Sequence, residues 1–310
     1  MAPRKSPPTL LLTGISSRLG RMIARSLHTE YRVIGVDPRG GVHMPRDVTV
    51  HALDLRRRKA EDIFRRNRID AVIHLPPEAP AAQTMDDHRN ASVVGTQKVL
   101  DYCQKHDIPK VVILSTAAVY GPRPDNPQFL TEEAPLLAGT RHHLMRDLVE
   151  TDMYATSFFW RHPEVDTVVL RPVHLVGRLN NAASQYLRLP RTPTILGFDP
   201  MMQIISSEDL ITALTRSLKP GIRGVFNVAG PPPLPLSELV RRARHTNLPL
   251  PEPLVRAMLA VKIGGGTAAV SAMQVEYLKF VCMVDDSRAR DTLRYTPRLD
   301  VAQTLAPISR

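Results

Sequence analysis

The sequence is poor in cysteine, in aromatic residues and in long apolar runs. Its two cysteines, Cys103 and Cys282, are too few for a disulfide framework or a metal cluster, so we expect no metal and a reducing, cytoplasmic location. No uncharged apolar run reaches the roughly 20 residues that a membrane-spanning helix needs. The short apolar stretch after Arg4 and Lys5 predicts a buried strand rather than a signal peptide.

Acidic residues are also in short supply relative to basic ones. The chain has 41 lysines and arginines against 30 aspartates and glutamates, for a formal net charge of +11. Basic residues cluster at 56–59 and 65–68 and can attract nucleic acid or an anionic membrane. No aromatic residues interleave with them to stack on bases, and no nucleic-acid motif is present. We therefore interpret the clusters as solvated helix surface and expect no nucleic-acid partner.

What the first half does contain is a regular alternation of short apolar runs and helical patterns. The expected strands are 9–13, 32–36, 49–52, 71–75, 111–115 and 167–171. Most of these runs are continuously apolar, as in parallel strands covered on both faces. The helical stripes between them are formed by Leu19, Met22, Ile23, Ser26 and Leu27, and by Val93, Thr96, Leu100 and Cys103. The pattern predicts an α/β fold with a doubly wound parallel sheet, which binds ligands at the carboxyl edge of its strands.

After the last of these strands the alternation breaks. Residues 178–203 are rich in proline and asparagine and predict an irregular segment. A helix over 207–218 and a strand over 225–228 follow, and we expect this strand to rejoin the sheet. Beyond a proline-rich break, residues 236–310 predict helices and loops with a flexible point at Gly264–Gly266.

The turn after the first strand carries the most specific motif. Residues 13–20 read TGISSRLG, in which Gly14 permits a tight turn and Gly20 permits close packing of helix on strand, as in dinucleotide-binding βαβ units. Ser17 stands where the usual middle glycine lets the backbone approach the pyrophosphate. Its side chain can either crowd the phosphate or donate a hydrogen bond to it. Helix N-terminal amides favour an anion at this point in either case.

The second strand ends in Asp37, which bears on the choice of dinucleotide. A carboxylate there can accept both ribose hydroxyls and repels a 2′-phosphate, so NAD is favoured over NADP. Arg39 is the counter-argument, because it can serve a 2′-phosphate. The residues that we expect to contact the dinucleotide along this stretch are Gly14, Ser16, Ser17, Arg18, Leu19, Gly20 and Asp37. We therefore expect a dinucleotide-binding Rossmann domain of residues 1–177 with 204–230, and a small C-terminal substrate lobe of residues 178–203 with 231–310.

Taken together, the motifs resemble the extended short-chain dehydrogenase/reductase family, in particular its NAD-dependent epimerase/dehydratase branch. The segments that carry the resemblance are TGISSRLG (13–20), Asp37, ALDL (52–55), VIHLPP (72–77), STAAVYG (115–121), LRPVHLVG (170–177), QIISSEDL (203–210) and DDSRARDTLRYTPRL (285–299). The resemblance implies that Asp54 and Leu55 lie near adenine, and that Leu75 and Pro76 line the dinucleotide. It also implies that Ser115 contacts the cofactor and that Thr116 lies beside the nicotinamide as the family's active-site Ser/Thr.

The sequence departs from the family pattern at several of these positions. Pro76 and Pro77 remove two backbone donors, and Ser92 and His174 stand where the family has asparagine. The family's chemistry also needs a Tyr-x-x-x-Lys pair on one helix face, in which the lysine lowers the pKa of the tyrosine that takes the substrate proton. None of the seven tyrosines has a lysine four residues later.

Alignment of residues 139–152 places Leu144 at the tyrosine position and Leu148 at the lysine position. Two leucines four residues apart form an apolar face, so Thr116 is interpreted as a catalytic remnant and little hydride transfer is expected. A register shifted by one residue instead brings His143 and Asp147 to the same place, and an imidazole is a credible base. His174 can also face the pocket, or be a simple loop histidine.

Three functions follow from these observations. The interpretation we favour is an NAD-binding epimerase/dehydratase-like protein that is catalytically impaired and acts as a sensor, a scaffold or a regulator. The second is an active nucleotide-sugar epimerase, dehydratase or reductase that uses a substitute base such as His143. The third is a module that binds nucleic acid or a membrane surface. The resemblance also implies a homodimer or another protein partner through helices around 90–105 and 143–159, to which the exposure of Phe158 and Phe159 is relevant.

Overall fold

The computed structural model describes residues 7–41, 43–76, 89–140, 143–262 and 275–309. At its centre is a parallel sheet of seven strands in the order β11-β6-β5-β4-β1-β2-β3. The strands are β1 (Thr9–Thr13), β2 (Arg32–Val36), β3 (Thr49–His51), β4 (Ala71–His74), β5 (Lys110–Leu114), β6 (Asp166–Pro172) and β11 (Gly224–Val228). The order reverses between β1 and β4, which is the doubly wound α/β topology. The predicted fold class is confirmed.

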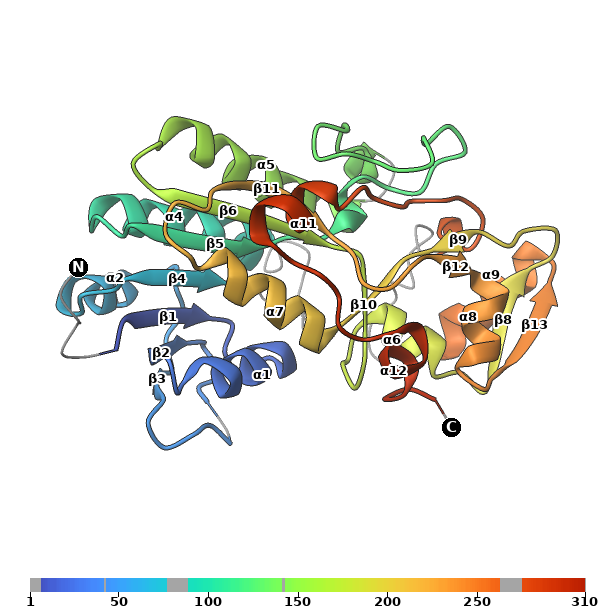
Figure 1. The fold of residues 1–310 in the computed structure, drawn as a ribbon, viewed down its shortest axis with the longest axis horizontal. Helices are drawn as coiled ribbons and strands as arrows, with labels where there is room; N and C mark the ends of the chain where they lie inside the picture. The colour runs from blue at the N-terminus through green and yellow to red at the C-terminus, as the bar shows by residue number, and fades with distance from the viewer. Residues whose placement is uncertain (1–6, 42, 77–88, 141–142, 263–274, 310) are drawn as a thin grey trace.

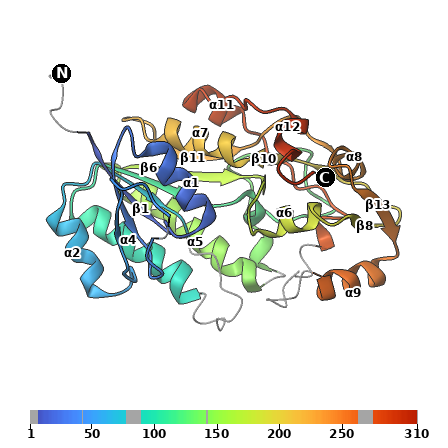
Figure 2. The same ribbon diagram turned by 90° about the horizontal axis from the view of Figure 1, so that it is seen from below.

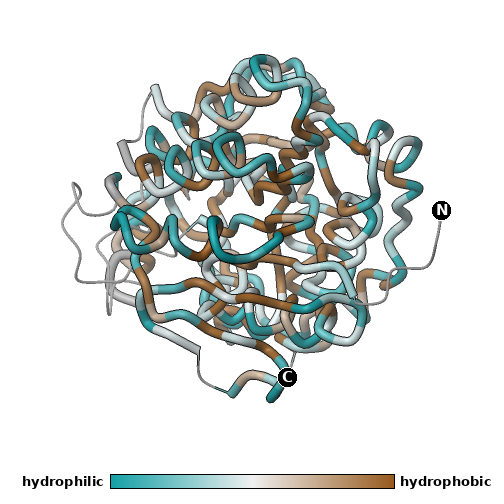
Figure 3. Tube along the Cα trace, turned by 90° about the vertical axis from the view of Figure 1, so that its left-hand side faces the viewer, coloured by the Kyte–Doolittle hydropathy of each residue, from teal (hydrophilic) through white to brown (hydrophobic). Residues whose placement is uncertain are grey.

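The apolar runs are continuous because both faces of the sheet are buried. Leu10, Leu11 and Leu12 of β1 are each fully buried. Leu10 and Leu12 belong to the core on one face, and Leu11 belongs to the core on the other, because successive side chains of a strand point to opposite faces. Figure 3 shows the resulting apolar centre, with more polar segments around it.

Helices cover both faces of the sheet (Figure 2). The helices on one face are α1 (Arg18–Leu27), α7 (Ser207–Ser217) and α11 (Ser287–Leu293), and those on the other are α2 (Arg58–Arg66), α4 (Gly95–Lys105) and α5 (His143–Arg161). A π-helical turn, Asn90–Val94, precedes α4. All four residues of the stripe predicted for α4 are buried, but the stripe on α1 is partly wrong, since Ser26 is exposed and Ala24 is buried in the core instead.

The rest of the chain forms a second group of elements beside the carboxyl edge of the sheet, at the right in Figure 1. Its elements are β7 (His174–Val176), α6 (Ala182–Leu187), β8 (Arg191–Ile195), β9 (Met201–Met202), β10 (Ile204–Ser206), β12 (Leu234–Pro235), α8 (Leu236–Arg242), β13 (Thr246–Leu250), α9 (Glu252–Lys262) and α12 (Val301–Leu305). Leu187, Ile195, Leu239 and Leu259 contribute to a hydrophobic cluster of its own. The domain boundaries drawn from the sequence remain a prediction.

Two expectations for this part of the chain are wrong. Residues 178–203 are not irregular, because Asn181 caps α6 by accepting from the Ser184 amide, and β8 pairs in parallel with β13. Residues 236–310, predicted to hold only helices and loops, also contain the strand β13. The expected flexible point at Gly264–Gly266 lies outside the described residues. No helix in the described part of the chain has the length and apolarity that crossing a membrane requires.

Candidate active site

The glycine turn lies at the carboxyl end of β1, where the strand order of the sheet reverses. Gly14 has a φ of +69°, and a Cβ at this position would lie 2.9 Å from the Leu75 carbonyl oxygen. A Cβ at Gly20 would lie 2.4 Å from the Gly14 carbonyl oxygen and 2.8 Å from the Ile15 Cα. A side chain fits at neither position, so both glycines hold the backbone of the turn close to the start of α1.

The polar groups of the turn fit a phosphate. Ser17 caps α1, and its Oγ accepts from the Gly20 amide at 2.9 Å, which leaves the hydroxyl proton free to be donated. The Ser16 Oγ is buried and has no hydrogen-bond partner in the described structure. Arg18 is exposed at the first position of α1, whereas Leu19 is buried in the core and packs there. A pyrophosphate at this helix start would meet free amides, an orphaned hydroxyl and a cation.

Asp37 connects the glycine turn to the end of β2. Its Oδ2 accepts from the Ser16 amide at 3.3 Å, and its Oδ1 accepts from the Arg39 amide at 2.9 Å and from Arg39 Nε at 3.3 Å. The carboxylate is only 3% exposed. A ribose would therefore have to exchange with the Arg39 side chain. The Asp54 carboxylate is held by Arg56, whose hydrogen bonds lower the pKa of Asp54.

The other residues expected around the dinucleotide lie at the ends of neighbouring strands. Leu75 follows β4 and is buried against Gly14, while Pro76 is half-buried beside it and Pro77 lies outside the described residues. Leu55 packs against the core on the α2 side of the sheet. Contact of these residues with a dinucleotide remains a prediction.

A buried chain of hydrogen bonds that the sequence did not reveal lies at the ends of β1 and β4. His74 Nδ1 is 2.7 Å from Thr13 Oγ1, and its Nε2 is 2.9 Å from Thr96 Oγ1. Because Thr96 donates its hydroxyl proton to the Ser92 carbonyl, Nε2 must donate and Nδ1 must accept from Thr13. Burial lowers the pKa of His74 to about 4, so the ring is neutral. The chain ties β1, β4 and α4 together next to the glycine turn.

Ser115 and Thr116 follow β5 and have different roles. Thr116 caps the 3-10 turn Ala117–Val119, where its Oγ1 accepts from the Ala118 amide at 3.2 Å, and it lines a cavity. Ser115 Oγ also borders this cavity but donates to Asp152 Oδ2 at 2.5 Å. Thr116 therefore lines the cavity, whereas the hydroxyl of Ser115 is hydrogen-bonded to a buried ionic network.

The network stands behind the cavity and was also missed from the sequence. The Asp152 and Arg171 side chains, 0% and 3% exposed, are joined by hydrogen bonds of 2.6 and 2.9 Å. Arg171 also donates to the Tyr120 hydroxyl at 2.8 Å, and Tyr120 donates to Asn227 Oδ1 at 2.8 Å. Burial raises the pKa of Tyr120 to about 12. The network links α5, β6 and β11, and its buried charges are paired as their desolvation requires.

The cavity beside Thr116 has a volume of about 500 Å³ and lies at the carboxyl ends of β5 and β6. Met145 and Leu148, one helical turn apart on α5, line it together with Thr116. Asp147 is buried but is not among the described α5 residues that line the cavity. The side chains of His143 and Leu144, at the start of α5, lie outside the described residues.

His174 lines the same cavity, so the structure favours this alternative over a simple loop histidine. Its ring stands edge-on to Tyr277, with the ring centroids 4.8 Å apart. Burial lowers the pKa of His174 to about 4 and raises that of Tyr277. Tyr277 is a pocket residue that the sequence gave no reason to select, because it lies more than 100 residues from His174.

Comparison with known proteins now identifies the family. The profile of the NAD dependent epimerase/dehydratase family matches residues 10–229. The chain belongs to this family. An uncharacterised protein of Mycobacterium tuberculosis is 28% identical over 304 residues, which cover 94% of this chain and 81% of that protein. UDP-glucose 4-epimerase 2 of rice is 29% identical over 203 residues, which cover 57% of this chain and 48% of the epimerase.

Solved structures of the same fold come from sugar-nucleotide enzymes. The dTDP-glucose 4,6-dehydratase of Bacillus anthracis, in complex with NAD, has a TM-score of 0.73 at 15% identity over 97% of this chain and 95% of its own. The UDP-glucose 4-epimerase of Thermotoga maritima, with UDP-glucose, has a TM-score of 0.72 at 18% identity over 97% of both chains. The family is NAD-dependent, so the prediction of an NAD-dependent epimerase/dehydratase relative is confirmed at the level of the family.

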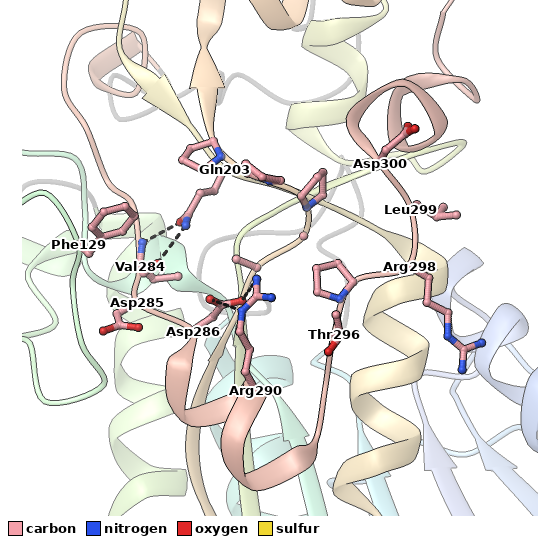
Figure 4. Close-up of a pocket in the computed structure, with 16 residues that line it drawn as sticks. Phe129, Gln203, Val284, Asp285, Asp286, Arg290, Thr296, Arg298, Leu299 and Asp300 are labelled. Atoms are coloured by element: carbon pink, nitrogen blue, oxygen red, sulfur yellow. Dashed lines mark hydrogen bonds and ion pairs between the residues drawn. The ribbon is translucent and has the colours of Figure 1, made fainter.

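The structure has a second pocket, of about 580 Å³, whose lining includes Gln203, Val284, Asp286 and Arg290 (Figure 4). Gln203 lines it and makes two hydrogen bonds to the backbone of Val284, at 2.7 and 3.0 Å. The neighbouring Met202 and Ile204 line the Thr116 cavity instead. Arg290 in the second pocket is paired with Asp286 at 2.9 Å. In the described ranges, no group of three His, Cys, Asp or Glu side chains is placed to bind a metal in either pocket.

Proposed function

We propose that this family member binds NAD in the turn between β1 and α1 but transfers hydride poorly, and acts as a sensor, a scaffold or a regulator. The observation that supports the proposal is the apolar character of the wall that α5 contributes to the Thr116 cavity. The described α5 residues on that wall are Met145 and Leu148, which are both apolar. The bound nicotinamide would supply a hydride acceptor, but the described helix face offers no group that accepts a proton.

The site residues fit the dinucleotide. The Ser16 hydroxyl is buried and orphaned in the glycine turn, and the amides of the first turn of α1 adjoin it. A phosphate oxygen at that point would satisfy groups that the described protein leaves unpaired. Asp37 at the end of β2 supports NAD over NADP, because a buried carboxylate disfavours a 2′-phosphate.

The remaining polar groups of the cavity are weak substitutes for a catalytic base. The Thr116 hydroxyl has no basic neighbour among its described hydrogen-bond partners. His174, with a pKa lowered to about 4, has little tendency to take a proton at neutral pH. General acid–base catalysis typically contributes about 10²–10⁴-fold, so its loss supports a protein whose turnover is slow. The alternative is an active sugar-nucleotide enzyme with a substitute base, His143 or His174.

The test has two stages. First, mass spectrometry of the ligand released from the purified protein identifies the cofactor, and we expect NAD. Second, the NAD-loaded protein is mixed with UDP-glucose or dTDP-glucose, and the absorbance of NADH is followed. We expect no appreciable reduction. Rapid reduction that collapses in His143→Ala or His174→Ala, with NAD binding intact, would establish the active alternative instead.

A double variant tests whether the site differs from the family pattern only at the tyrosine and lysine positions. Leu144→Tyr with Leu148→Lys restores the family pair, and we expect little recovery, because Leu148 packs in an apolar wall beside Met145. Robust recovery of NADH formation would mean that only two side chains separate this chain from an active enzyme.

We also propose a homodimer through α4 and α5, which contact each other on the same face of the sheet. Phe158 of α5 is buried in the core and Phe159 is half-buried. Among the described residues of α5, the exposed large apolar ones are Met153 and Trp160, at 59% and 74%. They lie seven residues apart, on one side of the helix, and suit the matching helix of a second copy.

A cytoplasmic location is the last part of the proposal. Both cysteines are free thiols in the structure, Cys103 buried and Cys282 half-buried. Burial raises the pKa of both thiols, which keeps them protonated and unreactive. Free thiols of this kind are typical of reducing compartments.

A further inference from the structure

We propose that the Thr116 cavity binds an uncharged, largely apolar ligand whose single hydroxyl or carbonyl group is hydrogen-bonded by His174. The inference rests on the proposed function because it assumes that the substrate or effector of the NAD-binding protein lies in this cavity. It assigns that molecule to a chemical class different from the nucleoside-diphosphate sugars named for relatives.

The first argument is the charge of the wall. In the described part of the chain, the cavity lining contains no lysine, arginine, aspartate or glutamate. A diphosphate placed there would lose its hydration and meet no cation of the described lining, and an uncompensated buried charge is strongly unfavourable. Arg171 is already paired with Asp152 and is not among the described residues that line the cavity.

Most polar side chains of the described wall already form hydrogen bonds with other residues of the protein. Ser115 donates its hydroxyl to Asp152. Asn181 donates from Nδ2 to the Leu175 carbonyl at 2.6 Å and accepts at Oδ1 from the Ser184 amide. Tyr186 donates its hydroxyl to the Pro193 carbonyl at 2.8 Å. These groups hold α6 and its neighbours in place, and of their donors only the second Nδ2 hydrogen of Asn181 has no described acceptor.

Tyr277 contributes its ring more than its hydroxyl. The hydroxyl oxygen is buried and makes no hydrogen bond to a described nitrogen or oxygen atom. Its neighbour is the Cys282 thiol, a weak hydrogen-bond acceptor. The ring itself forms part of the cavity wall and packs against the edge of His174.

His174, Thr116 and one Nδ2 hydrogen of Asn181 are the side-chain donors of the described wall that remain open to a ligand. No hydrogen bond to a described residue engages the His174 ring, which is enclosed by protein yet touches the cavity. A neutral imidazole has one donor and one acceptor nitrogen, so it can bind either a hydroxyl or a carbonyl. Most other residues of the described wall are apolar, with Leu236 and Leu239 of α8, Leu259 of α9 and Leu278 among them.

The ligand class can be tested with the full-length protein and two probes. Diphenylhexatriene, a fluorescent hydrocarbon, reports occupation of the cavity, and dodecanol is the uncharged competitor with one hydroxyl. We expect saturable binding of diphenylhexatriene at one site per chain, displacement by dodecanol, and no displacement by UDP-glucose. Absence of saturable binding, or displacement by UDP-glucose in place of dodecanol, would overturn the proposal.

Two variants locate the site, and a third serves as their control. Leu148→Arg places a cation in the wall and is expected to abolish diphenylhexatriene binding, whereas Leu254→Arg, at a 53% exposed position on α9, is expected to leave it unchanged. His174→Phe removes the hydrogen bond and keeps an aromatic ring. It should weaken dodecanol binding about two- to tenfold, the range for one neutral hydrogen bond, without weakening the hydrocarbon probe.

The outcomes separate this inference from the proposed function. Thermal unfolding checks that each variant is folded, and His174→Phe decides the head-group assignment even where Leu148→Arg does not fold. An unchanged dodecanol affinity in His174→Phe refutes the role of His174. Calorimetry with NAD is run on the same samples. In the parent protein, absence of NAD binding with diphenylhexatriene binding present contradicts the proposed function alone, and NAD binding without saturable diphenylhexatriene binding contradicts the ligand class alone.

Discussion

Substitution of Gly20 by alanine tests the geometry on which the cofactor site depends. A Cβ at Gly20 would lie 2.4 Å from the Gly14 carbonyl oxygen and 2.8 Å from the Ile15 Cα. Both are backbone atoms, so no flexible side chain can move aside, and α1 must shift away from the turn. Overpacking of this kind costs about 1–3 kcal/mol in the free energy of unfolding. Because the shift separates the helix amides from the turn, we expect NAD affinity to fall by at least about tenfold, or 1.4 kcal/mol.

Gly95 provides a matched control for the same chemical change. It lies at the start of α4, and a Cβ there would have no heavy atom of a described residue within 4 Å, apart from its chain neighbours and the backbone of its own helix. Alanine in place of glycine within a helix stabilises by about 0.5–1 kcal/mol. Urea unfolding measures both stabilities, and isothermal calorimetry measures NAD affinity. If Gly20→Ala unfolds at the same urea concentration as the parent and binds NAD equally well, the close approach of α1 to the turn is not what builds the site.

Three further predictions concern the buried polar groups and the surface of α5. Asp152→Ala leaves Arg171 charged and buried, and should lower the free energy of unfolding by about 3–5 kcal/mol; Asp62→Ala, which breaks an exposed pair, should cost less than about 1 kcal/mol by the same urea titration. Burial holds the pKa of His74 at about 4, below its unfolded value of 6.5, so the unfolded chain binds more protons and stability falls as pH drops from 6.5 to 4. His74→Gln should remove up to about 3 kcal/mol of that pH dependence, and an unchanged pH profile would contradict a neutral buried ring. Trp160→Glu should convert the proposed dimer to a monomer in light scattering, and a dimer that persists would place the interface elsewhere.

The strands of the sheet could be predicted because their signal is local. Burial on both faces makes each strand a continuous apolar run, as in Leu10, Leu11 and Leu12. The pair β8–β13 carries no such run, since Pro193 and Pro249 interrupt it and most of β13 is exposed or half-exposed. Its pairing joins segments about 55 residues apart, and short-range patterns do not reveal it.

In the site, too, local motifs could be predicted and long-range contacts could not. The glycine turn could be recognised because Gly14, Ser17 and Gly20 act within one short segment. The His74 chain and the Asp152–Arg171 network could not, because each joins polar side chains from different elements, and each residue alone is indistinguishable from a surface residue. The apolar character of the Thr116 cavity was visible on α5, at Leu148, but its extension over the second group of elements needed the fold.

We propose that the NAD site adjoins an α5 face whose described residues, Met145 and Leu148, neither accept nor supply protons. The most direct measurement is a crystal structure of the NAD complex. We expect the nicotinamide ribose and ring to have no tyrosine hydroxyl and no lysine ammonium within about 3.2 Å, the limit of a hydrogen bond, and Leu148 to face them. A tyrosine hydroxyl together with an ammonium group at hydrogen-bond distance from the nicotinamide ribose would contradict it.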